Sequence, residues 1–329
     1  FEEGAFKMRQ LRIEAKGNIN NWLSYRYRQR LNRSNDSSGN IDNLPTSIDI
    51  AGIGVKLGKG FSIFAGKQCT AYGGIEFDLN PIEIYEYSDM IENMSNFMTG
   101  LNIGYDINAH QQLNLQILDS RNGSFNKMYG VETEDGEQPA IESGKLPLVY
   151  TLNWNGNFND IFKTRWSASI MNEAKDKNLY YFAFGNELNL NKFNMFLDFM
   201  YSKEGIDRKG IMTGITDSME GHNAFDAGYF SMVTKLNYRF LPKWNAFVKG
   251  MYETASLTKQ QGDLEKGKYR TAWGYFAGVE FYPMDTNLHF FLTYVGRSYD
   301  FTARAKALGQ ENYSTNRVSV GFIYQLPMF

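Results

Sequence analysis

The sequence has no long apolar run. Charged or amide residues interrupt each apolar stretch within a few positions, so the roughly 18 consecutive apolar residues that a transmembrane helix needs never occur. A helical membrane protein is therefore excluded. The opening segment FEEGAFKMRQ also lacks the basic start, apolar stretch and small-residue cleavage site of a secretory signal, so we expect an exported protein to be present here in its mature form.

Cysteine and histidine are scarce. The single Cys69 cannot form an intrachain disulfide and belongs to no metal-binding pair, so we expect an unpaired thiol without a function. The three histidines, His110, His222 and His289, have no nucleophile or orienting partner at a spacing that indicates catalysis. We predict that the protein is not an enzyme and that it has no catalytic residues, no cofactor and no metal site.

Neither sign of charge is in large excess. The formal net charge is −2, which gives no argument for a nucleic-acid partner. One acidic cluster lacks the ligand register of a calcium loop and is predicted to be an exposed loop; it comprises Glu132, Glu134, Asp135 and Glu137.

Aromatic residues are abundant, at 16%, and alternation of apolar and polar residues is the dominant pattern. The alternation recurs in segments of roughly ten to fifteen residues, the length of tilted strands that cross a membrane. Helical periodicity is nearly absent. We predict strands at 6–17, 21–33, 48–57, 61–68, 97–107, 111–120, 146–158, 162–173, 178–190, 193–204, 227–241, 244–257, 270–282, 288–299 and 314–328.

Two kinds of connection alternate between these strands. Short ones such as 17–20 and 108–110 are rich in turn formers, whereas others such as 69–96 are long and polar. Short turns on one side and long loops on the other are typical of an outer-membrane barrel, in which the turns face the periplasm. A soluble sandwich has no reason to obey this rule.

Each strand also has an apolar and a polar face. Leu148, Tyr150 and Leu152 alternate with Thr151 and Asn153, a pattern that suits a sandwich as well as a barrel with a wet interior. Aromatic residues near the short turns and the C-terminus favour the barrel because they would form its periplasmic girdle, although aromatics also favour strands in general. They are Trp22, Phe61, Tyr105, Phe158, Phe162, Phe193, Tyr238, Phe240, Trp244, Phe281, Tyr282 and Tyr324.

The predicted fold class is therefore an all-β transmembrane antiparallel β-barrel that forms one domain over residues 1–329. Single-chain bacterial barrels have an even number of strands, with both termini on the periplasmic side. The short turn at 17–20 requires the opening strand to run down from the outer surface, so we expect that one strand precedes Phe1. About fifteen strands are visible, and sixteen are expected in the intact barrel.

Three stretches resemble a known family. FKMRQLRIEAKGNINNWLSYRYRQRL resembles the opening of the phosphate-selective porin O and P family, and FAGKQCTAYGGIEF is similar to its strand that enters the first large loop. The chain ends in Phe329 after an apolar-alternating strand, which is similar to the assembly signal of many barrels. The remaining pattern resembles the Bacteroidetes branch. The resemblance implies a sixteen-stranded barrel, often trimeric, with an inward-folded loop and basic residues along an anion path.

A wall of arginines is the best positional match to that anion path. Arg26, Arg28 and Arg30 share one strand face, and their spacing of two aims all three guanidiniums to the same side. Facing the lumen they would attract anions, whereas a solvated polar face is the alternative. The candidate pore-lining basic residues are Arg12, Lys16, Arg26, Arg28, Arg30, Lys163 and Arg165.

An acidic segment departs from simple anion selectivity. The candidate constriction loop, 69–96, carries six carboxylates without a Lys or Arg between them, namely Glu76, Asp78, Glu83, Glu86, Asp89 and Glu92. If the loop folds inward, with a short helix near 82–94, the carboxylates would face the arginine wall and produce a transverse field that weakens strict anion selection. The alternative is a solvated loop.

We predict an outer-membrane porin for passive diffusion of small hydrophilic solutes and ions, with an anion or phosphate preference if the arginine wall lines the path. The alternative is a plugged or structural barrel subunit that anchors partner proteins. The expected partners are membrane lipid and lipopolysaccharide, small hydrophilic solutes or anions, and further copies in a homotrimer or a larger outer-membrane complex. No nucleic-acid partner is expected, and the predicted location is the bacterial outer membrane.

Overall fold

Fifteen antiparallel strands form one sheet in the computed structural model, which describes residues 3–37, 39–79, 81–131, 141–216, 222–284 and 287–326. Each strand is hydrogen-bonded to its neighbours in sequence, in the order β1 to β15. The strands are β1 Arg12–Asn18, β2 Leu23–Arg30, β3 Ile48–Gly58, β4 Phe61–Cys69, β5 Phe97–Asn108, β6 Gln111–Asp119, β7 Leu148–Phe158, β8 Phe162–Ala174, β9 Lys177–Asn189, β10 Phe193–Ile206, β11 Phe225–Leu241, β12 Trp244–Leu257, β13 Gly267–Phe281, β14 Leu288–Phe301 and β15 Tyr313–Tyr324.

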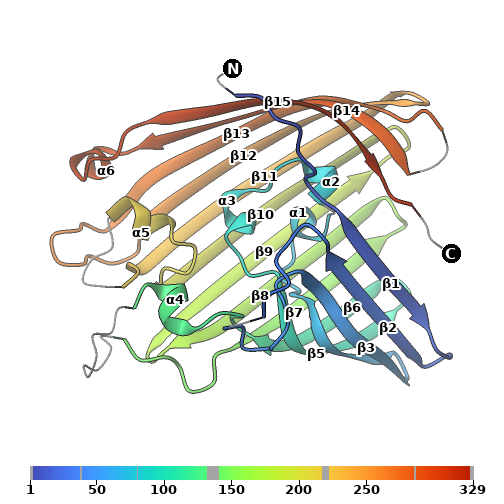
Figure 1. Cartoon of the computed structure of the whole chain (residues 1–329), viewed down its shortest axis with the longest axis horizontal. Helices are drawn as coiled ribbons and strands as arrows, with labels where there is room; N and C mark the ends of the chain where they lie inside the picture. The colour runs from blue at the N-terminus through green and yellow to red at the C-terminus, as the bar shows by residue number, and fades with distance from the viewer. Residues whose placement is uncertain are drawn as a thin grey trace.

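Short helices occupy the long connections. They are α1 Ile75–Asp78, α2 Pro81–Ile84, α3 Asp89–Glu92, α4 Phe125–Tyr129, α5 Ile211–Thr216 and α6 Ala303–Ala307. The sheet is strongly curved, and the segment that carries α1 to α3 lies within the curve (Figure 1). No helix in the described parts of the chain is both long enough and apolar enough to cross a bilayer.

The fifteen strands predicted from the alternation are all present. Most ends agree within two or three residues, because turn formers and the end of the alternation coincide. The main difference is at the first strand, which begins at Arg12 rather than at residue 6. The backbone hydrogen bonds of this pair of strands end at Leu11. Its carbonyl accepts a hydrogen bond from the amide of Leu31, just after β2, at 2.8 Å.

The edges of the sheet are β1 and β15. Within the described ranges β1 pairs only with β2, and β15 pairs only with β14. The predicted sixteenth strand is not among these residues. The acidic cluster Glu132, Glu134, Asp135 and Glu137 and the terminal Phe329 also lie outside the described residues.

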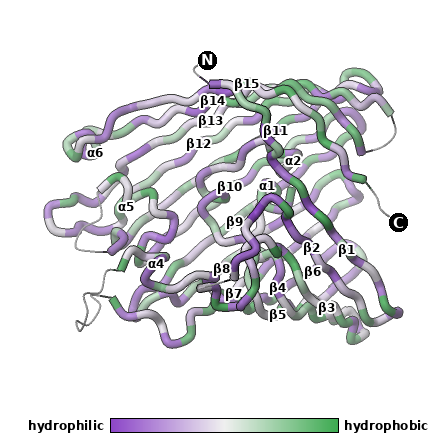
Figure 2. Tube along the Cα trace, in the orientation of Figure 1, coloured by the Kyte–Doolittle hydropathy of each residue, from purple (hydrophilic) through white to green (hydrophobic). Residues whose placement is uncertain are grey.

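Apolar and polar residues alternate along the strands, as the colours of Figure 2 show. Large apolar side chains on the outer face are exposed, with Leu152 at 56% and Phe184 at 46%, whereas their polar neighbours Thr151 and Asn153 are buried. Aromatic pairs flank the short turns, such as Phe61 with Tyr105 at 4.5 Å between ring centroids. Most of the predicted girdle is exposed on this face, namely Trp22, Phe61, Tyr105, Phe158, Phe162, Tyr238, Phe240, Trp244 and Tyr324.

Candidate functional site

The connection between β4 and β5, residues 70–96, is called the inward loop because it packs against the inner face of the sheet. Its path depends on close backbone contact with β9. Gly73 and Gly74 adopt positive φ angles of 71° and 84°, and a Cβ on Gly185 would lie 2.7 Å from the Cα of Gly74. Glycine at these positions lets the loop reach the strand wall.

Two buried carboxylates of the wall hold backbone amides of the inward loop. Asp198 on β10 accepts hydrogen bonds from the amides of Ile75 and Glu76, at 2.9 and 2.7 Å. Glu253 on β12 accepts from the amides of Asp89 and Met90, both at 3.0 Å. Because amides at helix starts have no partner within the helix, these carboxylates satisfy donors at the first turns of α1 and α3.

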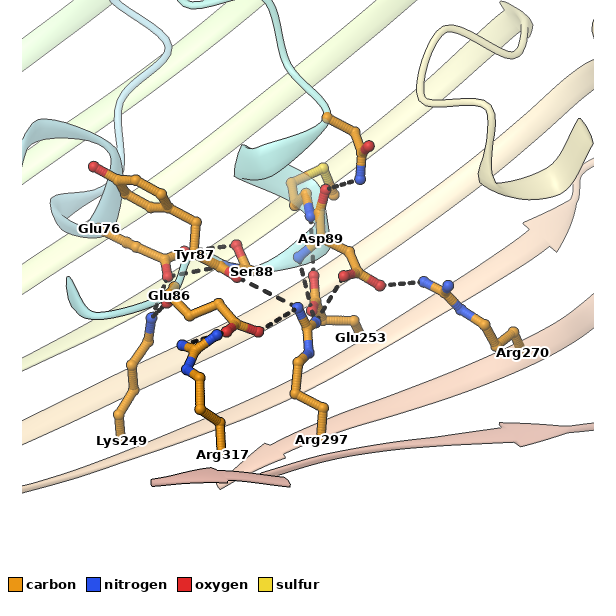
Figure 3. Close-up of polar contacts among 12 residues, drawn as sticks. Glu76, Glu86, Tyr87, Ser88, Asp89, Lys249, Glu253, Arg270, Arg297 and Arg317 are labelled. Carbon is orange, nitrogen blue, oxygen red and sulfur yellow. Dashed lines mark hydrogen bonds and ion pairs between the residues drawn. The ribbon is translucent and has the colours of Figure 1, made fainter. Parts of the chain in front are cut away.

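Cations of the wall pair with the carboxylates of the inward loop (Figure 3). Lys249 lies 2.5 Å from Glu76, and both side chains are fully buried. Arg297 lies 2.7 Å from Asp89 and also contacts Glu253 on the wall, at 2.9 Å. Separating the two members of such a pair leaves a buried charge without a partner, so the contacts hold the loop in one position.

Further contacts join the acidic residues of the loop to the wall. Glu86 pairs with Arg317 at 2.8 Å, and Asp89 also contacts Arg270. Asp78 pairs with Arg165 at 3.0 Å, and the carbonyl of Glu83 accepts a hydrogen bond from Lys235 at 2.5 Å. Glu92 is exposed.

An apolar layer supports the same arrangement. Tyr85 stacks on Phe247 of β12 with ring centroids 4.9 Å apart, and its hydroxyl donates to Glu280 at 2.6 Å. Buried apolar residues of the inward loop form one cluster with inward-facing residues of the later strands. The loop contributes Tyr72, Ile75, Phe77, Ile84, Tyr85, Met90, Ile91 and Met94 to this cluster.

Most of the acidic residues pair with strands other than the one that carries Arg26, Arg28 and Arg30, whereas Asp78 lines the same cavity as Arg26. The expected transverse field stays a prediction. The partners of the acidic residues stand on β8 and on β12 to β15, because those strands present cations at inward-facing positions beside the loop. Apart from Arg165, sequence analysis did not single out these partners. The sequence does contain a signal for such partners, namely charged residues at inward positions of an aromatic-rich strand. Lys249 and Glu253 on β12 are examples.

Three of the predicted basic residues lie around a carboxylate that the sequence analysis did not single out. Asp49, which is fully buried, lies 2.8 Å from Arg30, 3.3 Å from Arg28 and 3.8 Å from Arg12. Arg28 also lies over the ring of Phe97, 5.1 Å from its centroid. Three cations around one anion leave a local excess of positive charge at the inner face of β1 to β3.

The other predicted basic residues are separate from this cluster. Arg26 pairs with Glu14 at 2.8 Å, and Lys16, which is exposed, is directly opposite Arg26 in the β1–β2 register. Lys163 lies 4.0 Å from Glu187. The seven residues thus form no continuous line: three share Asp49, and each of the others has a different neighbour.

A buried arginine, Arg208, connects several of the long loops through hydrogen bonds and an ion pair. Arg208, just after β10, contacts Glu173 on β8 and donates to Tyr129 at 3.2 Å and to Ser95 at 2.8 Å. Burial lowers the pKa of the Arg208 guanidinium, but the Glu173 carboxylate raises it further, so the net shift is upward. The arginine stays charged and holds the end of the inward loop against two other connections.

Open space remains on the opposite side of the inward loop. A cavity of about 290 Å³ is bounded by the start of the loop and by inward residues of β2 to β7. A second cavity of about 350 Å³ lies at the β5–β6 turn and the short-turn end of β7 and β8. Gln112 and Asn155 line both cavities, so the two spaces adjoin.

A curved antiparallel sheet with an exposed apolar outside, a polar inside and a loop packed within defines a channel of the porin class. The family model of phosphate-selective porins O and P matches residues 2–326, and the chain belongs to that family. The protein is therefore an outer-membrane porin, and its family is one of channels rather than enzymes.

Solved structures with similar folds are also outer-membrane proteins. The outer membrane channel DcaP of Acinetobacter baumannii has 10% identity and a TM-score of 0.62, over 95% of this chain and 83% of that chain. OmpT of Vibrio cholerae has 10% identity and a TM-score of 0.53, over 94% and 85%. The anion-selective porin from Comamonas acidovorans has 9% identity and a TM-score of 0.53, over 95% and 88%. No curated protein sequence matches the chain.

Proposed function

We propose that small hydrophilic solutes and ions diffuse through the space between the inward loop and the wall formed by β2 to β8. The observation that carries this proposal is the one-sided anchoring of the loop. Its carboxylates and apolar side chains are held by β8 to β15, while polar cavities border its other side. The inward loop then acts as the constriction.

Planar-bilayer recording of the purified protein tests this function. We expect ohmic conductance steps, because a polar passage conducts without gating chemistry. A plugged barrel that anchors partners is the second candidate, and the dense contacts between the inward loop and the wall favour it. That candidate predicts no steps, so a silent bilayer with correctly inserted protein would exclude the porin mechanism.

We further propose a moderate preference for anions. Its support is the excess of arginine over carboxylate around Asp49, together with the family name. Replacing Arg26, Arg28 and Arg30 by Gln should lower the anion-to-cation permeability ratio, measured as the reversal potential in a salt gradient. Unchanged selectivity would remove these arginines from the mechanism.

Assembly remains part of the proposal. One similar structure, OmpT of Vibrio cholerae, is described as a trimer form, and we infer that this protein also forms trimers in contact with lipid and lipopolysaccharide. Chemical cross-linking in native membranes tests this. A sixteenth strand between β15 and β1 and an origin in the Bacteroidetes branch stay predictions from the sequence.

A further inference from the structure

Side-chain amides line the space beside the inward loop. They come from β4 to β7 and face the two adjoining cavities on successive inward positions of neighbouring strands. We call this set the amide wall; it comprises Gln68, Asn102, Gln112, Asn114, Gln116, Asn153 and Asn155. An amide both donates and accepts hydrogen bonds, so such a wall can match a hydroxyl group in either role.

The amides are partly held by one another. Asn102 donates to Asn114 at 3.1 Å, and Asn114 donates to Gln112 at 3.0 Å. Gln116 donates to Gln68 at 3.0 Å. These bonds fix the orientation of the side chains before any solute arrives, which lowers the entropy lost on binding.

Two acceptor atoms of the amide wall take no part in these hydrogen bonds. The Oδ1 atoms of Asn102 and Asn155 are buried and accept no hydrogen bond from the described residues. A buried acceptor without a donor is unfavourable, so a rotation of either amide that brings its oxygen to the cavity and to a solute hydroxyl is favoured. The unprotonated oxygens of a phosphate are acceptors and gain nothing from these atoms, so phosphate has fewer donors to offer them than a sugar has.

Formal charges beside the amide wall balance. The cavity next to the inward loop is lined by one cation and one carboxylate, Arg26 and Asp78, each with a partner of its own. The adjoining cavity has Asp106 and Arg165. The excess of arginine around Asp49 is thus not repeated here, and the local field gives little advantage to an anion.

We infer that the amide wall is a binding site for neutral, polyhydroxylated solutes of about monosaccharide size. The cavities of about 290 and 350 Å³ are at the lower end of the range of roughly 300–1,000 Å³ that small-molecule sites occupy. The inference rests on the proposed diffusion path and adds a solute class to it.

Glucose and inorganic phosphate are the probes of the test. Single channels of the purified protein are recorded in planar bilayers while either solute is added. We expect glucose to produce saturable current noise and phosphate to produce less at equal concentration. Glucose without effect, or phosphate with the stronger effect, would overturn the inference. Conductance steps recorded before any solute is added test the proposed diffusion path. The solute class is tested separately, so the failure of one proposal can be told from the failure of the other.

A double variant locates the site. Asn102→Leu with Asn155→Leu should raise the half-saturating glucose concentration at least about 5-fold, since each lost hydrogen bond is worth a factor of roughly 2 to 12. The matched control is Asn237→Leu, an inward amide on β11 that bonds Asn194 at 3.2 Å and lies outside both cavities. Equal shifts in both variants would overturn the site. If the double variant does not insert, the wild-type comparison of glucose with phosphate still decides.

Discussion

At the scale of single residues, Asp49 determines how much charge the arginine cluster presents. Its carboxylate lies within 4 Å of three guanidiniums and is fully buried, so it cancels part of their charge and holds them together. The cluster therefore attracts anions less strongly than the arginines alone would. The Asp49 carboxylate therefore limits the anion preference proposed for the channel.

Asp49→Asn should raise the anion-to-cation permeability ratio roughly 2- to 5-fold, because a unit charge about 4 Å away is worth ~1 kcal/mol in water. The measurement is the reversal potential across a KCl gradient. Asp49→Glu keeps the charge and is the control. The shift must be opposite to that of the Arg-to-Gln variant; shifts in the same direction would show that selectivity arises elsewhere.

At the scale of elements, the inward loop is held by contacts at both of its ends. Asp198 fixes the start of α1, and Glu253 with Arg297 fixes the start of α3. Helices of four residues are not stable by themselves, so these wall contacts determine where they form. In the proposed diffusion path, the width of the passage thus depends on strands that are distant from the loop in sequence.

Asp198→Ala should loosen the start of the inward loop, because two buried amides lose their acceptor at a cost of about 1–3 kcal/mol each. Single-channel recordings should then show larger and noisier conductance. Glu187→Ala removes another inward carboxylate that pairs with Lys163 instead of the loop, and it serves as the control. A conductance identical to that of the wild type would mean that the loop does not set the passage.

The sequence predicted the strands much better than the site. Alternation with a period of two is a local signal, so the β-strands and the placement of Arg26, Arg28 and Arg30 on one strand face could be derived from it. The partners of the acidic residues could not, because Glu76 meets Lys249 across 173 positions of sequence. Only the curvature of the sheet brings such residues together, and no local pattern encodes its register.

At the scale of the whole molecule, the outer face decides where the protein can reside. Exposed apolar side chains cover the strands from β2 to β15, an area that water would not tolerate and hydrocarbon favours. The inner face is polar or is covered by the inward loop. The outer face is therefore suited to contact with lipid.

Phe184→Arg places a charge near the middle of the outer face of β9, and it should destabilise the folded protein by about 2–4 kcal/mol. Urea unfolding of the protein in lipid vesicles measures this free energy. Asn191→Arg, in an exposed turn after β9, adds the same charge outside the hydrocarbon and should be nearly neutral. Equal stabilities would contradict the assignment of this face to lipid.

The long-range anchoring of the inward loop also determines the order of assembly. The loop emerges between the fourth and fifth strands, but the charged side chains that hold it come 87 to 231 residues later, from Arg165 through to Arg317. Contacts of such separation form late, because the intervening chain must first be ordered. We accordingly expect the loop to take its final position only after the last strands have joined the sheet.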